Sequence, residues 1–538
     1  MGKICSKPSE LFCGDEKEPH QSIIASQKSS MRKFSASELE QRFLMTKKYM
    51  QFAWEQNLKT NSNSELLTQL ASLKSTLISK ISNCQIQKVY DLGKVVGEGY
   101  CGTVRQARLI EDKGLGRLYA VKSLNKRKIT AANIEAVRRE IDIIKECDCY
   151  YIVQFYECYE DEHYFHIVTE FCEGGDLVSF VEKKNGISEE RAKKWFWQAA
   201  TAVNYLHHFG VVHRDIKLDN FMLSSAKEEE ADLHLIDFGF ATYYRERAPK
   251  SIVGTPFYVA PEVLGKNYSK ECDVWSLGVL LYMMMFADPP FSGKRNTQIF
   301  ESIKTKEPSF TSAACQSISP ELRSLLEGLL KKNPAERLTI SQALQNPWFN
   351  SAFTSFSSNW HSSMTLELLE SLRKSKPRKR FQREVVHLMI RVHHEDPEVE
   401  KLAKVFALMD FLNKGVVGSH ELMHAYQALG SSLTKEEAQK IIDNSFLRTP
   451  GYLSNTEFVA AAIDPSFFQS DVHLQPVFHR MDLDKCGHIG FEDIKFCFER
   501  FGYGLDDEMV TEFLTEFDYS KDGLISYPEF KRAVSGSI

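Results

Sequence analysis

The chain has 538 residues, 43% of them hydrophobic, and this length predicts about three or four folded domains. A net charge of −5 provides no general attraction for polyanions, so no nucleic-acid partner is expected. The twelve cysteines lack paired metal-binding spacing and follow no apolar leader, which favours a reducing intracellular compartment and excludes a disulfide-stapled fold.

The chain begins with the pattern of N-myristoylation, Met-Gly-Lys-Ile-Cys-Ser, in which Gly2 becomes the acylated terminus. Cys5 is placed to receive a palmitoyl group, and a second chain matters because one myristoyl group binds membranes only weakly. We expect an acyl anchor in membrane lipids at the cytoplasmic face of a membrane, the plasma membrane, with a cytoplasmic pool. The alternative is an unmodified chance Met-Gly start. The rest of residues 1–88 is expected to be a largely flexible extension.

A strand, a glycine-rich turn and a second strand are predicted from Val96 to Val104. Glycine lets a backbone approach phosphate closely. Dinucleotide-binding folds use the same glycine spacing, but there a helix follows the turn, whereas here a strand does. The residues expected to bind nucleotide are Val96, Gly97, Glu98, Gly99, Gly102 and Val104.

A lysine ends the next short apolar strand, at Lys122, and Glu140 follows in a helical stretch. The two are predicted to form an ion pair in which the lysine binds the α and β phosphates and the glutamate holds the lysine. Taken singly, each residue would be interpreted as a surface charge.

The run from His213 to Asn220 is followed by an Asp-Phe-Gly triplet that begins at Asp237. The spacing between Asp215 and Asn220 places a base and a magnesium ligand on one short turn, with Asp215 accepting the proton of the substrate hydroxyl. Asp237 supplies a second magnesium ligand beside the phosphates, and Lys217 neutralises the transferring phosphate. These residues predict phosphoryl transfer with ATP and Mg²⁺ as cofactors.

An Ala-Pro-Glu triplet ending at Glu262 and a possible ion-pair partner, Arg337, follow in order. In their order and spacing, these motifs resemble the eukaryotic protein kinase family over residues 90–349. The resemblance implies an α+β bilobal protein kinase fold acting on protein substrates. A Gly-Thr-Pro triplet at Gly254 and the lysine at Lys217 resemble Ser/Thr rather than Tyr kinases.

The same resemblance implies roles for further residues. The backbones of Glu170 and Cys172 would contact adenine, and Asp176 stands where relatives bind an arginine before the target hydroxyl, so basic substrates are expected. Ser251 stands where many kinases carry a phosphorylated residue, and its phosphate would pair with Arg214. An unmodified loop serine is the alternative.

Residues 350–395 combine Ser-rich sequence, a basic run from Arg373 to Arg380 and an apolar stretch around Val385–Ile390. Pro377 interrupts any continuous helix. A basic amphipathic segment in this position predicts an autoinhibitory junction that a calcium-binding lobe can capture.

A calcium loop needs oxygen donors at its first, third, fifth and twelfth positions, glycine at the sixth and a backbone carbonyl at the seventh. The last loop of the chain meets every requirement, so it is predicted to bind Ca²⁺. Its predicted ligands are Asp518, Ser520, Asp522, Leu524 and Glu529.

The preceding loop has Cys486 in place of an oxygen donor and the shorter Asp493 at the last position, which predicts a weaker calcium site. Its predicted ligands are Asp482, Asp484, Cys486, His488 and Asp493.

Two earlier repeats keep the helix spacing but not the ligands. From Asp410 to Glu421, Lys414 occupies a donor position, and the repeat from Phe446 to Glu457 is expected only to pair with its neighbour. Neither is expected to bind calcium. The four repeats predict an all-α EF-hand domain of two lobes, residues 396–467 and 468–538.

A kinase, a basic junction and four EF-hand repeats in this order resemble the calcium-dependent protein kinases of plants and protists over residues 90–538. The resemblance implies a Ser/Thr kinase inhibited by its junction until Ca²⁺ binds the C-terminal lobe, and a monomer is expected. One alternative is a calcium-independent kinase with structural repeats, which the lost donors favour. The other, a pseudokinase scaffold, is opposed by the intact set Lys122, Asp215, Asn220 and Asp237.

Overall fold

The computed structural model describes residues 86–99, 102–110, 116–129, 131–244, 254–310, 317–349, 366–375, 377–445, 450–501 and 505–535. All of them belong to one unit of the chain, residues 49–538. Gly2, Cys5 and Ser251 lie outside the described residues, and so does Phe446. Within the described part, no helix combines the length and apolarity that a bilayer crossing requires.

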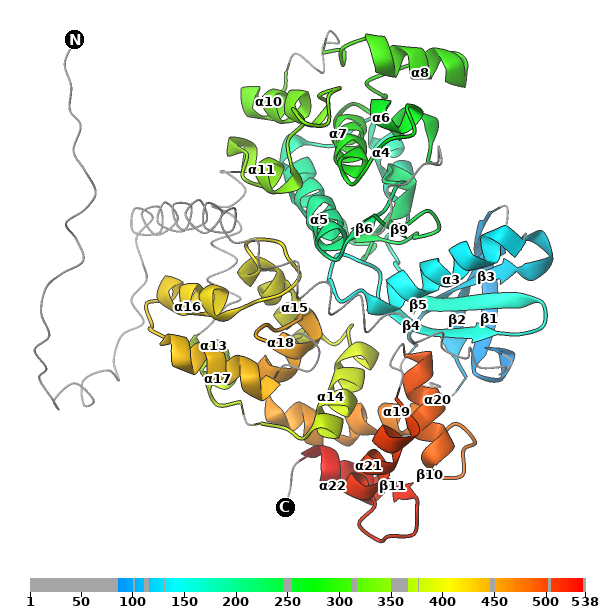
Figure 1. Cartoon of the computed structure of the whole chain (residues 1–538), viewed down its shortest axis with the longest axis vertical. Helices are drawn as coiled ribbons and strands as arrows, with labels where there is room; N and C mark the ends of the chain where they lie inside the picture. Colours follow the sequence, from blue (N-terminus) through cyan, green and yellow to red (C-terminus); the bar gives the residue numbers. More distant parts are fainter. Residues whose placement is uncertain are drawn as a thin grey trace, which may run out of the picture. The chain divides into compact units, whose positions relative to one another are not determined.

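The smaller kinase lobe is a five-stranded antiparallel sheet with the order β1-β2-β3-β5-β4, beside which helix α3 lies (Figure 1). Successive side chains of β3 point to opposite faces of the sheet, so Val121 is fully buried while Lys122 lies on the other face. Apolar side chains of α3, including Ile141 and Ile144, pack in the same core as Phe155 of β4. The elements are β1 (Tyr90–Glu98), β2 (Gly102–Leu109), β3 (Tyr119–Asn125), α3 (Ala131–Glu146), β4 (Phe155–Glu160) and β5 (Tyr164–Glu170), with the short helices η2 (Ile86–Lys88) and η3 (Lys126–Lys128).

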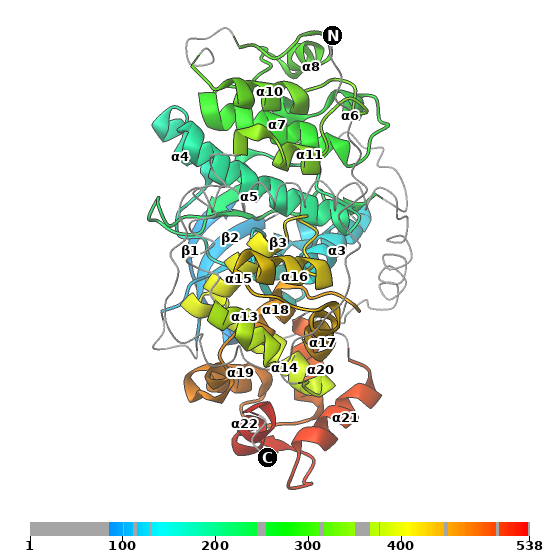
Figure 2. The ribbon, with the colours of Figure 1, turned by 90° about the vertical axis from the view of Figure 1, so that its left-hand side faces the viewer.

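The larger lobe is mainly helical, with α5, α7, α10 and α11 in its body (Figure 2). Helix α7 is apolar on nearly every side, and most of its residues are buried because α5 and α10 cover it. Its helices are α4 (Leu177–Lys184), α5 (Glu189–His208), α6 (Pro261–Leu264), α7 (Glu271–Phe286), α8 (Asn296–Thr305), α10 (Pro320–Leu329) and α11 (Ile340–Leu344). Its short elements are β6 (Val211–Val212), η4 (Leu218–Asn220), β7 (Phe221–Leu223), β8 (Leu233–Leu235), β9 (Thr242–Tyr243), η5 (Pro256–Tyr258) and η6 (Pro347–Phe349).

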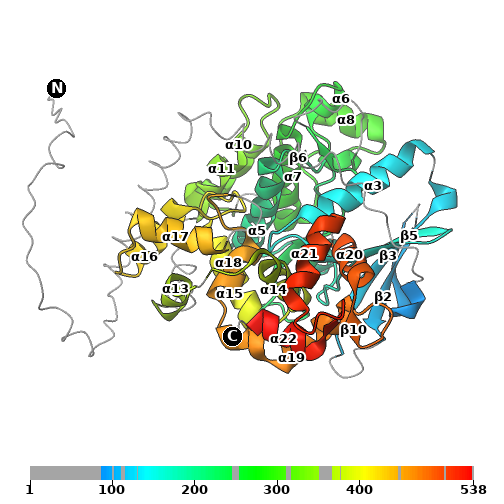
Figure 3. The ribbon, with the colours of Figure 1, turned by 60° about the horizontal axis from the view of Figure 1, so that its bottom comes forward.

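The remaining described residues form helices around a second apolar core. As the position of Pro377 predicted, α13 and α14 are separate helices. The C-terminal helices α19 to α22 pack on one another (Figure 3). Strand β10 pairs with β11 between their two loops. The elements are α13 (Leu366–Arg373), α14 (Arg380–Val392), α15 (Pro397–Met409), α16 (Ser419–Ala428), α17 (Lys435–Ser445), α18 (Asn455–Ala462), η7 (Pro465–Gln469), α19 (Asp471–Met481), β10 (His488–Ile489), α20 (Phe491–Arg500), α21 (Asp507–Phe517), β11 (Ile525–Ser526) and α22 (Tyr527–Ser535).

One expectation about the degenerate repeats is wrong. The repeat ending at Glu457 does pair with its neighbour, through a bridge between Val417 and Leu453. It also binds the kinase, because the Thr456 backbone N–H and hydroxyl donate to the Asp148 carboxylate at 3.0 and 2.7 Å. A helix start with unpaired N–H groups is a favourable partner for a carboxylate, so this repeat is also a docking element.

Candidate active site and calcium loops

The predicted ion pair between β3 and α3 is present. Lys122 Nζ lies 2.6 Å from Glu140 Oε1 and 2.8 Å from Asp237 Oδ1. Burial alone would lower the pKa of Lys122, but the two carboxylates outweigh it, so the pKa is raised and the lysine keeps its charge. Burial likewise opposes ionisation of Asp237, yet Lys122 brings the pKa of that carboxyl to about 2. The group is therefore a fixed positive charge next to an ionised metal ligand.

The described ends of the turn between β1 and β2 are two glycines. Gly99 and Gly102 exchange backbone hydrogen bonds of 2.9 and 3.3 Å. A Cβ on Gly102 would lie 2.1 Å from the Ser123 carbonyl oxygen, so only glycine fits against β3. Of the predicted flanking residues, Glu98 pairs with Thr103, Gly97 pairs with Val104, and Val96 is 45% exposed.

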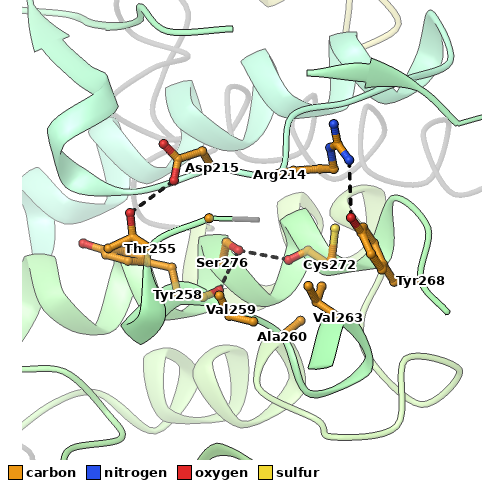
Figure 4. Close-up of a pocket in the computed structure, with 11 residues that line it drawn as sticks. Arg214, Asp215, Thr255, Tyr258, Val259, Ala260, Val263, Tyr268, Cys272 and Ser276 are labelled. Carbon is orange, nitrogen blue, oxygen red and sulfur yellow. Dashed lines mark hydrogen bonds between the residues drawn. The ribbon is translucent and has the colours of Figure 1, made fainter. Parts of the chain in front are cut away.

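The catalytic loop places several groups around the Asp215 carboxylate. Lys217 Nζ lies 2.8 Å from Oδ2, and the Thr255 hydroxyl donates to Oδ1 at 3.2 Å (Figure 4). The Asn220 amide donates to the Asp215 carbonyl at 2.7 Å and to Oδ2 at 2.9 Å, which orients its own Oδ1, a hard oxygen suited to Mg²⁺. An acceptor for a hydroxyl proton and a positive charge for a phosphoryl group thus stand side by side.

Asp273, for which no role was predicted, holds this loop through hydrogen bonds to its backbone. It is fully buried, and its carboxylate accepts the backbone N–H groups of His213 and Arg214, both at 2.8 Å, and His207 Nε2 at the same distance. Arg214 has φ +69°, a left-handed conformation that an arginine adopts only when its surroundings fix it. The position of Asp273 in an Asp-Val-Trp-Ser run was the available signal.

The segment before α6 is fixed at both ends. Gly254 has φ +102°, and a Cβ there would lie 2.8 Å from the Arg214 carbonyl oxygen. Glu262 forms the predicted ion pair with Arg337, at 2.6 Å, with no part of the arginine side chain exposed. Ser251 lies outside the described residues. Its predicted partner Arg214 donates from Nε to the Phe240 carbonyl at 2.7 Å. Thr255, the middle residue of the Gly-Thr-Pro triplet, contacts both Asp215 and Lys217 of the catalytic loop, a role that was not predicted for it.

Glu170 is the last residue of β5 and Cys172 follows it, and both are buried. The Glu170 N–H donates to the Gln154 carbonyl at 3.0 Å. Burial alone would raise the pKa of Glu170, but His234 and His394 outweigh it and hold the pKa well below its usual value. Asp176 caps α4, accepting the Ser179 N–H at 2.7 Å, so its carboxylate also has a structural role.

The last loop is folded as a calcium loop around inward-pointing oxygens. Asp518 accepts the Gly523 N–H at 2.8 Å and the Ser520 hydroxyl at 3.1 Å, and Glu529 accepts the Ser520 N–H at 2.8 Å. Gly523 has φ +85°, the turn that its position requires. Burial opposes ionisation of Glu529, but hydrogen bonds from Ser526 and Ser520 lower the pKa to about 2, so the carboxylate is ionised for Ca²⁺. Asp522 accepts the Leu524 N–H at 3.0 Å.

The preceding loop has the same turn with a poorer ligand set. Asp482, Asp484 and Cys486 bring their ligand atoms within 4.8 Å of one another, and Gly487 has φ +85°. The Asp493 carboxylate bonds the Leu483 and Gly490 N–H groups at 3.0 and 2.9 Å, and burial raises its pKa. His488 pairs with Ser526 of the last loop, so the two loops share one ladder.

The loop of the first repeat, which begins at Asp410, contacts the kinase helix α5. Asp410 is buried, which raises its pKa to about 8, and it accepts the Lys414 N–H at 2.9 Å. The Thr201 hydroxyl and the Asn204 amide of α5 donate to Asn413, at 3.0 and 2.7 Å. This loop therefore binds the kinase helix where a working loop would bind calcium.

A two-lobed fold with these paired charges and this catalytic loop defines a protein kinase. A model of the protein kinase domain matches residues 90–349, and a model of an EF-hand domain pair matches residues 471–535. Calcium-dependent protein kinase 29 of Arabidopsis thaliana is 34% identical over 83% of this chain and 82% of its own length. Calcium-dependent protein kinase 19 of Oryza sativa subsp. japonica is 33% identical over 84% of this chain and 83% of its own.

The chain belongs to the calcium-dependent protein kinase family. It is a calcium-dependent Ser/Thr protein kinase that uses ATP and Mg²⁺, acts on proteins and takes Ca²⁺ in its EF-hand pair. The predicted fold, a bilobal kinase followed by an all-α EF-hand domain, is confirmed.

Proposed function

We propose that Ca²⁺ in the C-terminal EF-hand lobe activates this kinase by holding the junction away from an inhibitory position. The observation that carries the proposal is the seating of α14 in that lobe. The ring centroids of Phe381 and Phe513 are 5.0 Å apart, and the Gln382 amide donates to the Ala533 carbonyl at 2.7 Å. Both partners belong to the helices that flank the last calcium loop, so loss of calcium there would loosen this seat.

The other end of α14 contacts the kinase. Arg391 Nη2 donates to the Lys145 and Cys147 carbonyl groups, both at 3.2 Å, at the C-terminal end of α3. Since α3 carries Glu140, a seated junction supports the ion pair with Lys122. A released junction would lose this contact and become free to inhibit.

The test is peptide phosphorylation by the full chain, in chelator and in micromolar calcium. Glu529→Gln should abolish most of the calcium stimulation. Asp493→Asn, the matched change in the weaker loop, should reduce the stimulation less. One site occupied at about a hundredfold excess over its Kd contributes only about 2.7 kcal/mol, so a moderate stimulation is expected. Equal activity in chelator would favour the calcium-independent alternative, to which the first loop's attachment to α5 lends support.

Further proposals concern the substrate, the loop phosphate and the membrane. Asp176 would select basic residues before the target hydroxyl. Replacing the arginine of a substrate peptide by alanine should then lower kcat/KM more for the parent enzyme than for Asp176→Asn.

A phosphate on Ser251 would pair with Arg214, so Ser251→Ala should lower activity. Myristoyl and palmitoyl groups on Gly2 and Cys5 would anchor the chain, and Gly2→Ala should release it from vesicles.

A further inference from the structure

A cluster of side chains able to ligate a metal lies at the adenine segment, residues 170–172, whose backbone is expected to contact adenine, apart from both calcium loops. Glu170, Cys172 and His234 bring ligand atoms within 4.8 Å of one another, and each residue is less than 8% exposed. His394, just after α14, adds a fourth donor, since its Nε2 lies 3.1 Å from Glu170 Oε2. The cluster thus combines one thiol, two imidazoles and one carboxylate.

One contact within the cluster, between Cys172 and Glu170, has the spacing of a coordination shell, whereas His234 and Glu170 are in direct hydrogen-bond contact. Cys172 Sγ lies 3.5 Å from Glu170 Oε1, and His234 Nδ1 contacts the same oxygen. Bond lengths of about 2.0 to 2.3 Å to a tetrahedral ion put its ligands roughly 3.3 to 3.8 Å apart. Small adjustments of the side chains would therefore surround one ion.

Two further features prepare the site. The Tyr156 hydroxyl is hydrogen-bonded to His394 Nδ1 at 2.7 Å, which orients the imidazole with Nε2 towards the cluster, the arrangement that an outer partner gives to a metal-bound histidine. The His234 ring is buried, and Nδ1 is the nitrogen that it turns towards Glu170. A cavity reaches the cluster, and its wall includes Glu170, His234 and His394.

We propose that Glu170, Cys172, His234 and His394 form a binding site for one Zn²⁺ ion. Calcium and magnesium prefer oxygen ligands only, whereas thiolate and imidazole together favour zinc. On binding, bonds form from zinc to the Cys172 sulfur and to the ring nitrogens His234 Nδ1 and His394 Nε2. The Cys172 S–H proton and the two N–H protons that these nitrogens donate to Glu170 leave to solvent. The site needs neither the calcium loops nor the proposed release of the junction.

The position of this site gives it a consequence. Glu170 and Cys172 belong to the adenine segment, His234 lies on β8 shortly before Asp237, and His394 follows the junction helix. Zinc would tie these three segments together. It would hold the junction in its seat and fix the backbone expected to contact adenine.

The test uses the full chain, stripped of metal and kept reduced, and titrated with Co²⁺ and then Zn²⁺. Cobalt bound tetrahedrally by a thiolate gives a charge-transfer band in the near ultraviolet and strong visible bands. One equivalent should produce these bands, and zinc should remove them. Because Cys486 of the weaker calcium loop is also near two carboxylates, Cys486→Ser is the matched control and should keep the bands.

Cys172→Ser should abolish the thiolate band, and His394→Ala, at the less buried edge, should weaken cobalt affinity by about 100-fold while leaving circular dichroism unchanged. Tyr156→Phe should weaken it by about 10-fold through the lost outer hydrogen bond. Absence of a thiolate band in the parent chain, or its persistence in Cys172→Ser, would overturn the site and make the cluster a hydrogen-bonded network only.

Discussion

The charge network at Lys122 depends on one buried carboxylate that is supplied by a helix. Glu140 is 7% exposed and reaches Lys122 from α3, so the position of this helix decides whether the lysine is held. Glu135 lies on the same helix but is exposed, which makes it a matched site without the contact.

Glu140→Gln should lower kcat/KM by about 10- to 100-fold, because a neutral amide holds the lysine less firmly and Lys122 is left with Asp237 alone. Glu135→Gln should change it by less than about twofold. Steady-state phosphorylation at saturating calcium measures both. Equal losses would mean that the helix, rather than the ion pair, limits activity.

Asp410 makes the first EF-hand lobe sensitive to pH. Burial raises its pKa to about 8, whereas an unfolded aspartate titrates near 3.9. Between these values the folded state keeps a proton that the unfolded state has released, so stability falls as pH rises through this window and levels off above about 8.

In the variant Asp410→Asn, the side chain at this position cannot ionise in either the folded or the unfolded state. The melting temperature of the variant should therefore fall less steeply with rising pH than that of the parent. Relative to the parent, the variant should gain a few degrees between pH 5 and 8.5 in thermal unfolding with calcium fixed. The slopes are compared rather than the absolute values, because the amide also alters the bonds to Lys414 and Gly415. Parallel curves would show that Asp410 ionises normally.

A loop that has lost calcium holds α15 and α16 against the kinase helix α5. Gly415 has φ +74°, and a Cβ there would lie 2.1 Å from the Tyr205 ring of α5. Gly451, in the neighbouring repeat, has φ +82° but open space around it. The two glycines separate backbone strain from a steric clash.

Gly415→Ala should destabilise the chain by roughly 2 to 4 kcal/mol, because strain and overpacking add, whereas Gly451→Ala should cost only about 1 kcal/mol. Hydrogen exchange should show α5 amides opening faster in Gly415→Ala alone. Similar effects of the two variants would contradict docking of the loop on α5.

The sequence predicted what local pattern determines and missed what depends on distant partners. The spacing of Asp215 and Asn220, and the ligands of the last loop, are local signals, and the structure places these residues as a catalytic turn and a calcium loop. Asn413 gave no signal, because its meaning lies in contacts with Thr201 and Asn204, some two hundred residues away. Loss of calcium ligands indicates what a loop does not bind, but not what replaces the ion.

At the scale of the whole molecule, a buried carboxylate joins the sheet to the calcium lobe. Glu157 of β4 accepts the hydroxyl groups of Tyr90 and Tyr159, both at 2.6 Å, and lies 3.4 Å from both Arg480 and Arg500. Burial alone would raise the pKa of Glu157, but the two arginines outweigh it and the pKa is lowered. Since these arginines belong to α19 and α20, the helices that flank the weaker calcium loop, we expect movements of those helices to reach Glu157.

Glu157→Gln would leave two arginines near a neutral group, and breaking a buried charge cluster typically costs about 3 to 5 kcal/mol. Where that cost falls on the docked arrangement, most of the calcium stimulation should be lost while activity in chelator stays unchanged. Coupling between calcium binding and docking is reciprocal, so the calcium affinity of the last loop should also fall. A calcium titration followed by both phosphorylation and tyrosine fluorescence measures the two effects on one sample. A fall in stimulation without a fall in affinity would place Glu157 in the stability of the sheet and not in the link between calcium and the kinase.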